Sequence, residues 1–377
     1  MAVQRDNNPA DQEIRLVHPN DIQIKPVHAS KLLGLTGRTI KAIEEDHQLD
    51  IERVNQGAVS ARIYRPSDLF DIVAVRRERG QLKGLPEPAI VSTYVQKGGT
   101  GKTTVSVNLG ISLALQGLRV LMIDNDPQGD TSTMLGYDPD LTPEELAELG
   151  IDPDRGITAH LGNLIPLGSM FQRMTLEEVI KKPFGENGPH LIPADDSLNE
   201  MDIALRAANG ADFRYSLFLD KAINGDIPGC DLSQYDVIII DNAPSSSMLA
   251  TNSMLAADMI ICPIRMDKFS VKALTRLQRR MLEIEEDFNR SAAVVAVPTM
   301  FIRNRPRAQA NLATVSEAFR GQVSNALLYH SEDYTKSLEE GIPLYFWRSA
   351  SENSQGALRD FGKEIHQRLI ALMDDED

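Results

Sequence analysis

Cysteine, long apolar runs and an excess of positive charge are scarce or missing in this sequence of 377 residues. Its two cysteines, Cys230 and Cys262, have no C-x-x-C partner and no histidine at the spacing of a metal site. We therefore interpret both as buried residues of a protein from a reducing cytoplasm. No apolar run approaches the roughly 18 residues of a membrane span, and the first residues, MAVQRDNNPADQEIR, are too polar for a signal peptide. These absences predict a cytoplasmic protein without a membrane partner.

The missing positive charge argues against a protein that simply coats nucleic acid, because the net charge is −15. The charge is unevenly distributed. Residues 25–83 contain eleven Lys and Arg against eight Asp and Glu, so this region carries +3 and the rest of the chain −18. Such an asymmetry indicates two regions with different partners.

The length favours two domains, and the sequence pattern suggests where they divide. Residues 1–24 are predicted to be a polar N-terminal extension, helical or mobile, and residues 25–80 show short helical patterns. Residues 81–88, QLKGLPEP, have the composition of a linker. From 89 to 377, β-branched runs alternate with helical stretches, as in 89–96, 119–126, 236–244, 258–265 and 292–300. This predicts an α/β domain with a mostly parallel, doubly wound sheet and helices on both faces.

The segment VQKGGTGKTT, residues 95–104, lies between a predicted strand and a predicted amphipathic helix. A phosphate-binding loop of the pattern G-x-x-x-x-G-K-[ST] requires this context, although Gln96 stands where the pattern has its first glycine. The glycines would let backbone N–H groups surround a phosphate at the positive end of the helix dipole. Lys102 would neutralise phosphate charge and Thr103 would offer its hydroxyl to Mg²⁺. The predicted ATP-binding residues are Lys97, Gly98, Gly99, Thr100, Gly101, Lys102, Thr103 and Thr104.

Carboxylates follow two of the predicted strands. Asp124 and Asp126 end the strand in VLMIDND, and the two-residue period of a strand places both on one side. Ligands of open α/β sheets bind at this end of the strands, where paired carboxylates can hold metal-bound water and orient an attacking water. Asp241 follows four aliphatic residues in YDVIIID, the arrangement of a carboxylate that holds Mg²⁺ through water.

These three motifs, in this order, resemble those of the ParA partition ATPases, within the group that includes MinD and the nitrogenase iron protein. KGGTGKTT, 97–104, matches the deviant Walker A signature K-G-G-x-G-K-[ST]-T at every fixed position, and this signature needs no glycine at Gln96. DNDPQGDTS is similar to the family's D-x-D-P-Q-G segment. HLIPADDSL, 190–198, and VPTMF, 297–301, resemble its mid-domain stretch and its late strand. The resemblance covers residues 89–370.

The resemblance implies a weak ATPase that uses ATP, ADP and Mg²⁺ and forms a sandwich homodimer. Lys97 would then reach the partner's nucleotide, and Lys102 would serve the chain's own. Asp126 matches the carboxylate linked to water activation, with Asp124 beside it. The predicted catalytic residues are Lys97, Lys102, Asp124 and Asp126, and the predicted metal-binding residues are Thr103 and, through water, Asp241.

The chain also departs from the family pattern. After Asp241 the family usually continues as D-T-P-P, whereas Asn242 and Ala243 precede Pro244 here. HSEDY, 330–334, replaces the arginines with which short ParA proteins contact non-specific DNA, so that surface is not transferred. Other basic residues are available: Lys268, Lys272, Arg276, Arg279, Arg280, Arg303, Arg305 and Arg307. Lys272, Arg276, Arg279 and Arg280 share one helical face by spacing, which we interpret as a solvated face. The acidic end MDDED and the positions of the cysteines set MinD and the iron protein aside.

The N-terminal segment HASKLLGLTGRTIKAIEED, 28–46, has the spacing of a helix-turn-helix, with a turn at Gly34 and a cap at Thr36. Residues 54–80 predict a β-hairpin and a helix from Ser67. Together they resemble the winged, MerR-like operator-binding module of long ParA proteins. The predicted DNA-binding residues are Thr36, Arg38, Thr39, Lys41 and Arg62. A helical interaction domain without a DNA role is the alternative.

The sequence therefore predicts a cytoplasmic, nucleoid-associated ATPase that segregates a plasmid or chromosome. In its ATP state it would bind DNA without sequence preference, and a ParB-type centromere-binding partner would stimulate hydrolysis. The N-terminal module would bind the operator and make the protein a repressor of its own operon. The alternatives are a nucleotide-sensing transcriptional repressor without motor activity and, more weakly supported, a metabolic P-loop enzyme with a small-molecule acceptor.

Overall fold

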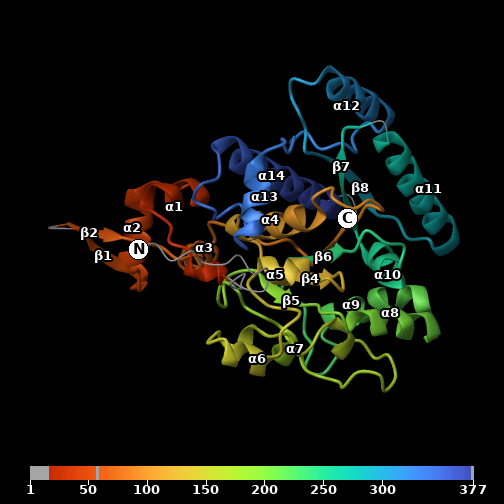
Figure 1. Cartoon of the computed structure of the whole chain (residues 1–377), viewed down its shortest axis with the longest axis horizontal. Coiled ribbons are helices and arrows are strands. Elements are labelled where there is room, and N and C mark those ends of the chain that lie inside the picture. Colours follow the sequence, from red (N-terminus) through yellow and green to blue (C-terminus); the bar gives the residue numbers. More distant parts are fainter. Residues whose placement is uncertain (1–16, 57–58, 268, 375–377) are drawn as a thin grey trace, which may run out of the picture.

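The centre of the molecule is a sheet of six parallel strands in the order β5-β4-β6-β3-β7-β8 (Figure 1). The computed structural model describes residues 17–56, 59–267 and 269–374. The strands are β3 (Ala89–Thr93), β4 (Val120–Asn125), β5 (His190–Ile192), β6 (Val237–Asn242), β7 (Met259–Arg265) and β8 (Ala293–Thr299). The predicted parallel sheet is confirmed. The edge strand β5 was not among the predicted strands, because its three residues are too few to show a β pattern.

The two faces of the sheet carry separate cores, because successive strand residues point to opposite sides. Val91, Met122 and Ile239 belong to the core beneath α4 (Lys102–Leu115) and α14 (Glu352–Asp374). Ile90, Ile123 and Ile240 belong to the other core. That second core is covered by α8 (Leu198–Ala207), α9 (Arg214–Ile223), α10 (Met248–Ala256), α11 (Ser270–Phe288) and α12 (Pro306–Ala318). Helices therefore lie on both faces, as predicted.

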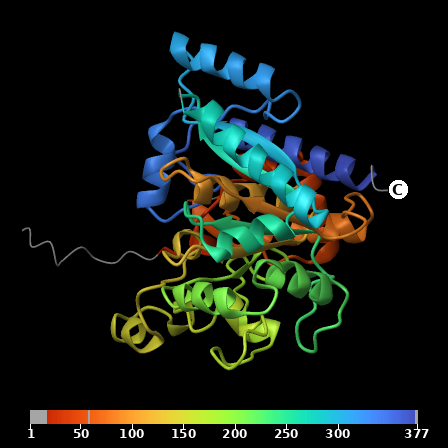
Figure 2. The ribbon, with the colours of Figure 1, turned by 90° about the vertical axis from the view of Figure 1, so that its right-hand side faces the viewer.

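The remaining helices of the α/β region are short. They are α5 (Asp130–Met134), α6 (Pro143–Glu148), α7 (Leu176–Val179) and α13 (Glu332–Glu339). In Figure 2, α12 lies at one end of the molecule and α6 at the opposite end, with the sheet between them. Within the described ranges no helix is long and apolar enough to cross a membrane.

The N-terminal region contains the predicted order of elements: α1 (Pro26–Leu33), α2 (Gly37–His47), the antiparallel hairpin β1 (Arg53–Gln56) and β2 (Val59–Arg62), and α3 (Pro66–Glu78). Gly34 ends α1 in the left-handed conformation, with a φ of 62°, and the Thr36 hydroxyl caps α2 by accepting from the N–H of Thr39. Helices α1 and α3 begin earlier than predicted, because Pro26 and Pro66 are preset for the first helical position. Of the predicted N-terminal extension, residues 1–16 lie outside the described residues.

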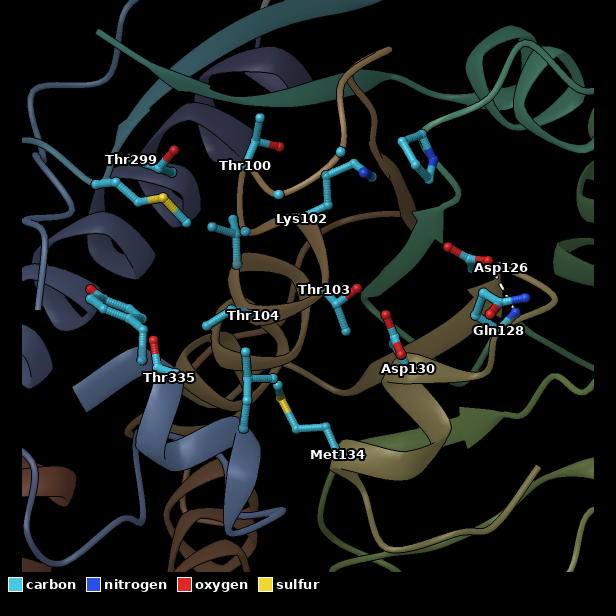
Figure 3. A pocket seen from close by; sticks show the side chains of 18 of the residues that line it. Thr100, Lys102, Thr103, Thr104, Asp126, Gln128, Asp130, Met134, Thr299 and Thr335 are labelled. Carbon is cyan, nitrogen blue, oxygen red and sulfur yellow. Dashed lines mark hydrogen bonds between the residues drawn. The ribbon is translucent and has the colours of Figure 1, made fainter. Parts of the chain in front are cut away.

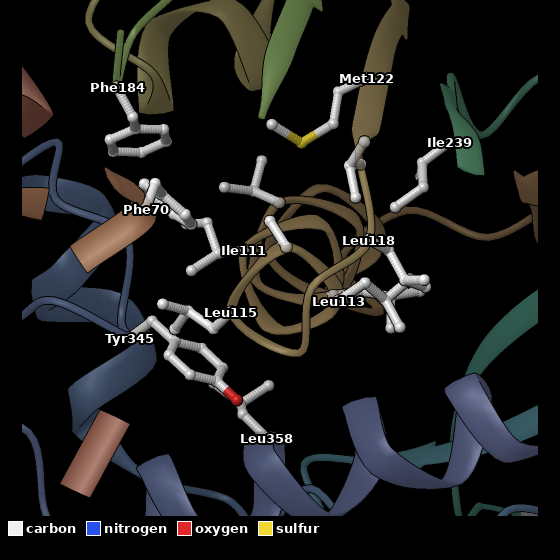
Figure 4. Packing of buried hydrophobic residues seen from close by; sticks show 14 of the residues in the cluster. Phe70, Ile111, Leu113, Leu115, Leu118, Met122, Phe184, Ile239, Tyr345 and Leu358 are labelled. Carbon is white, nitrogen blue, oxygen red and sulfur yellow. The ribbon is translucent and has the colours of Figure 1, made fainter. Parts of the chain in front are cut away.

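The N-terminal helices share a core with the α/β region (Figure 4). Phe70 of α3 packs against Phe184 and Phe346, with ring centroids 5.4 and 6.2 Å away. Residues 81–88 form neither helix nor strand, but the N–H of Leu85 donates to Asp236, which also pairs with Arg77 of α3. The predicted linker is thus fastened to the α/β region rather than free between two bodies.

Candidate nucleotide site

The glycine-rich segment forms the connection from β3 to α4, at the carboxyl end of the sheet. Gly101 precedes the helix with a φ of 86°, a conformation that favours glycine. A Cβ placed on Gly98 or Gly101 would meet no atom within 4 Å, so open space faces the backbone there. Arg265, the last residue of β7, donates to the carbonyl oxygen of Gly99 at 2.7 Å and holds the loop to the sheet. The loop is therefore a fixed cradle with room in front of it.

A cavity of about 630 Å³ opens in front of this loop (Figure 3). One side is formed by residues 98–105, and the next by Asp126 and Gln128 in the connection after β4 and by Asp130 at the start of α5. The far wall comes from Thr299, the last residue of β8, from Met300 after it, and from α13, which contributes Tyr334, Thr335 and Leu338. The predicted residues Gly98, Gly99, Thr100, Gly101, Lys102, Thr103 and Thr104 all line this cavity. Lys97 does not line it.

Lys102 lies at the bottom of the cavity with 8 % of its surface exposed. Burial lowers its pKa, and the nearby carboxylates Asp241, Asp126 and Asp130 oppose that shift. No described residue hydrogen-bonds or pairs with its ammonium group, and the buried hydroxyls of Thr100 and Thr299 also have no partner among the described residues. Buried polar groups are ordinarily satisfied. A bound phosphate group at the loop would offer partners to Lys102 and Thr100, so the residues present fit a nucleotide.

Asp241 stands at the carboxyl end of β6, buried beside the helix start. One of its carboxylate oxygens accepts from the hydroxyl of Ser106 at 2.8 Å and the other from that of Thr131 at 2.8 Å. Burial raises the pKa of Asp241 to about 6, against the opposing effect of the Ser106, Thr131 and Thr103 hydroxyls. Asp241 therefore belongs to a hydroxyl-lined pocket next to Thr103.

Asp124 and Asp126 have different surroundings although they leave the strand on the same side. Asp124 is fully buried and accepts from both the N–H and the hydroxyl of Ser132, at 2.9 and 2.7 Å. Burial and the nearby Asp241 raise its pKa well above the ordinary range. Asp126 faces the cavity and accepts from the N–H of Gln128 at 3.0 Å. Asp124 thus holds the loop that presents Asp126.

A magnesium ion at this site would need oxygens other than those of the protein. In the described part of the chain, no three His, Cys, Asp or Glu side chains gather closely enough to hold a metal ion. Mg²⁺ in nucleotide sites is bound by few side chains together with waters and phosphate oxygens. The Thr103 hydroxyl and the Asp241 carboxylate fit that manner of binding.

Lys97 turns away from the cavity. Its ammonium group lies 2.7 Å from a carboxylate oxygen of Asp267 and 5.7 Å from the ring centre of Phe269, which is half exposed. The Lys97 and Asp267 side chains are 40 % and 36 % exposed. The lysine is therefore accessible at the surface and does not contact its own chain's nucleotide cavity.

The predicted DNA-binding residues differ in the partners that their side chains contact. Arg38 and Lys41 lie exposed on α2, where Lys41 is 3.5 Å from Glu45. Thr36 and Thr39 are also exposed, but their side chains bond one another in the cap of α2. Arg62 donates to the buried Glu44 at 2.7 Å, which ties the hairpin to α2. Lys268, from the predicted basic group, lies outside the described residues.

Sequence reasoning missed several residues of the site. Ser106 and Thr131 bond Asp241 but come from different helices, and sequence spacing gives no sign of that meeting. Thr299 was also missed, whereas Met300 and α13 lie at the late segments 300–305 and 331–343, from which the sequence predicts contacts to the adenine. For Ser106, the one available signal is its place one helical turn after Lys102, on the side that faces the sheet.

The chain resembles known proteins both in sequence and in fold. Residues 88–294 match the model of a family described as "AAA domain". The chain is 28% identical over 274 residues to "Chromosome partitioning protein ParA" of Caulobacter vibrioides, covering 72% of this chain and 92% of that protein. It shares its fold with cobyrinic acid a,c-diamide synthase of Mycobacterium smegmatis, solved with ADP and magnesium, at a TM-score of 0.56 and 22% identity over 74% of this chain and 95% of that one. A structure described as "Partition Protein" matches at a TM-score of 0.57 and 16% identity, and covers 93% of this chain and 92% of that one.

Proposed function

Because the chain belongs to the family described as AAA domain, we propose that it is a ParA-type ATPase that partitions DNA and uses ATP and Mg²⁺. The observation that carries the proposal is the cavity at the glycine-rich loop, where the Lys102 ammonium and the buried Thr100 hydroxyl have no partner in the part of the chain that the structure describes. The name of its ParA relative supports the partition role, and the ADP and magnesium in a protein of the same fold support the cofactors.

In this proposal the cavity residues bind and orient the nucleotide. The N–H groups of residues 98–104 and the Lys102 ammonium surround the phosphates. The Thr103 hydroxyl and, through water, the Asp241 carboxylate would hold Mg²⁺, which would neutralise phosphate charge when bound. Asp126 orients the attacking water, since its carboxylate faces the cavity. Asp124 acts with it by fixing the loop through Ser132. Intrinsic hydrolysis is weak.

The proposal of a dimer rests on Lys97. It lies outside its own cavity, at an accessible position beside the phosphate loop. We propose that it reaches the partner's phosphates in an ATP-dependent homodimer, as the deviant Walker A signature implies. The dimer would bind nucleoid DNA without sequence preference and would be stimulated by a ParB-type centromere-binding protein, in the cytoplasm.

The N-terminal elements are proposed to be a winged helix-turn-helix that binds the operator. The exposed side chains of Arg38 and Lys41 on α2 are available to phosphates and bases. Arg62 would act chiefly by holding the hairpin to α2 through Glu44. The closeness of this module to the α/β region would let nucleotide state influence repression.

The test is ATP hydrolysis by the full-length protein, alone, with plasmid DNA, and with the centromere-binding protein encoded beside it. We expect slow turnover that the additions raise, loss of ATP binding in Lys102→Ala, and loss of turnover with retained ATP binding in Lys97→Ala. Lys221→Ala, an exposed change on α9, is the matched control. Tight operator binding without any turnover would instead identify the nucleotide-sensing repressor, and intact ATP binding in Lys102→Ala would refute the nucleotide site.

A further inference from the structure

A second cavity, of about 400 Å³, lies where the N-terminal helices meet the α/β region. We call it the junction cavity. Lys31 of α1, Arg76 of α3, and Arg359, Lys363 and His366 of α14 line it, together with the end of α4. It has no residue in common with the nucleotide cavity. It is therefore a separate space that joins three parts of the chain.

Positive charge dominates the lining of the junction cavity. Four of its lining side chains are Lys or Arg and none is Asp or Glu. Glu352, just outside, pairs with Lys31 at 2.6 Å and also with Arg359. This one carboxylate is shared between two of the cations and leaves the charge at the cavity unbalanced.

Among the described residues, the other two cations have no counter-ion. Within the described residues, neither Arg76 nor Lys363 has an ion pair or a side-chain hydrogen bond, and the Nε of Arg76 is buried without a partner. Buried donors without partners are costly, and unpaired cations that face one cavity repel each other. An anion bound between α3 and α14 would satisfy both side chains.

Part of the lining of the junction cavity is apolar. It consists of Leu32 and Leu33 of α1, Leu82, Leu115 and the ring of Tyr345. The Tyr345 hydroxyl is already bonded to the Ser112 hydroxyl at 2.6 Å, so its polar end has a partner within the chain. Figure 4 shows Leu115 and Tyr345 side by side at the end of α4. The ligand should therefore combine an anionic part with a flat or apolar part.

We propose that the junction cavity binds a small phosphorylated compound with at least two phosphate groups, of the kind found in nucleotides. Arg and Lys together are the usual ligands of phosphate oxygens, and several charges must be matched within a small volume. Such a compound would connect α1, α3 and α14 and so fasten the N-terminal region to the rest of the chain. This inference goes beyond the proposed ATPase and does not depend on it.

A bound anion there would also be linked to the nucleotide cavity. Helix α4 begins at Lys102 in the nucleotide cavity and ends at Leu115 in the junction cavity. The N–H of Tyr345 donates to Asn108 of α4 at 3.0 Å, close after the segment 334–341 that lines the nucleotide cavity. The same elements therefore border both cavities, which suits the junction cavity to an effector.

The test uses labelled inorganic pyrophosphate and equilibrium dialysis of the full chain, with the nucleotide cavity filled by a saturating non-hydrolysable ATP analogue and Mg²⁺. We expect one pyrophosphate per chain, bound equally well by Lys102→Ala without the analogue. Arg76→Gln and Lys363→Gln should each weaken binding about tenfold, the loss of one charge-assisted hydrogen bond. Lys363 is exposed on α14, so its replacement leaves the fold intact.

The matched controls are Arg305→Gln and Arg307→Gln, which remove the same charge from the exposed start of α12. They should bind pyrophosphate like the unmodified chain. Binding that disappears when the analogue is added would assign the pyrophosphate to the nucleotide cavity and overturn the proposal. Equal binding in all four variants would show adsorption to positive charge in general. Displacement of pyrophosphate by duplex DNA, with the same dependence on Arg76 and Lys363, would replace the small molecule by the DNA backbone.

Discussion

Asp267→Asn should increase ATP-dependent dimerisation, because Asp267 holds the lysine that we propose to act across the dimer. In the single chain the Lys97 ammonium lies 2.7 Å from the Asp267 carboxylate. Lys97 must leave this partner before it can reach a neighbouring nucleotide. The free energy of that step acts against the dimer, since only the released fraction of Lys97 is competent.

The magnitude follows from the exposure of the pair. With 40 % and 36 % of the two side chains exposed, this is a surface ion pair, worth about 0.2–1 kcal/mol. A homodimer contains two such pairs, so their loss should strengthen the ATP-bound dimer by about 0.4–2 kcal/mol, roughly 2- to 30-fold, and added salt should shrink the difference between variant and unmodified protein. The free energy of unfolding should change by less than about 1 kcal/mol.

The assay is sedimentation equilibrium with a non-hydrolysable ATP analogue and Mg²⁺, over a range of protein concentration. Asp46→Asn is the matched control, since Asp46 pairs with Arg79 at 3.1 Å on the surface of the N-terminal region. Lys97→Ala should prevent the gain when combined with Asp267→Asn. A weaker dimer in Asp267→Asn, or an equal gain in the control, would refute a holding role for Asp267.

Three further predictions concern stability, measured by urea unfolding of the nucleotide-free protein. Arg62→Gln should lower the free energy of unfolding by about 2 kcal/mol, because it removes the ion-pair partner of the buried Glu44. The loss should be smaller than the roughly 3–5 kcal/mol of a fully buried pair, since the Arg62 side chain is 25 % exposed. An unchanged stability would mean that Arg62 is free for DNA. Gly362→Ala should cost about 1–3 kcal/mol, since its Cβ would lie 2.0 Å from the Ser112 hydroxyl, and an unchanged stability would contradict the close packing of α14 on α4. Burial lowers the pKa of His190 below its ordinary 6.5, so the unfolded chain takes up a proton that the folded chain resists, and stability falls as the pH drops through that value. His190→Gln should reduce the stability difference between pH 7.5 and pH 5.5, and an undiminished difference would exclude this histidine as a cause.

The parts of the structure that could be predicted from sequence are those whose signal is local. The run of β-branched residues before the glycines and the apolar helix after them predict the strand, loop and helix around Lys102. Thr36 and Gly34 likewise mark helix ends through the chemistry of single residues. The carboxylates at the ends of β4 and β6 could be placed at one edge because the strands are parallel.

The parts that could not be predicted depend on residues far apart in the chain. Period two places Asp124 and Asp126 on the same side, but only the fold brings Ser132 to Asp124. The same holds for Arg62, which the sequence predicts to bind DNA but which donates to Glu44 in the structure. Contacts of this kind are set by loop closure and side-chain packing, for which a single sequence carries no periodic signal.

The departure at Asn242 shows how such a distant contact can explain an unusual residue. Its side-chain oxygen accepts from the amide of Asn125 at 2.8 Å, across the neighbouring ends of β6 and β4. Its amide group lies 3.0 Å from the Ser92 hydroxyl and 3.1 Å from that of Ser253, so it joins β3 and α10 as well. The Asn125 oxygen in turn accepts from the buried hydroxyl of Tyr215 at 2.8 Å.

A threonine at position 242, the usual residue of the family pattern, carries its hydroxyl on Cβ, one bond closer to the backbone than the amide atoms of Asn242, and so would not reach both Asn125 and the serines in this arrangement. Asn242→Thr would leave the amide of Asn125 buried without its acceptor, at a cost of about 1–3 kcal/mol. Asn125 is flanked by Asp124 and Asp126, and Asn242 follows Asp241, so the pair fixes the strand ends that carry all three carboxylates. Asn242, the residue that departs from the family pattern, and Asn125 therefore act as one hydrogen-bonded pair. Asn242→Thr should lower turnover through misplaced carboxylates while ATP binding at the glycine-rich loop persists, and equal losses of binding and turnover would refute this positioning role.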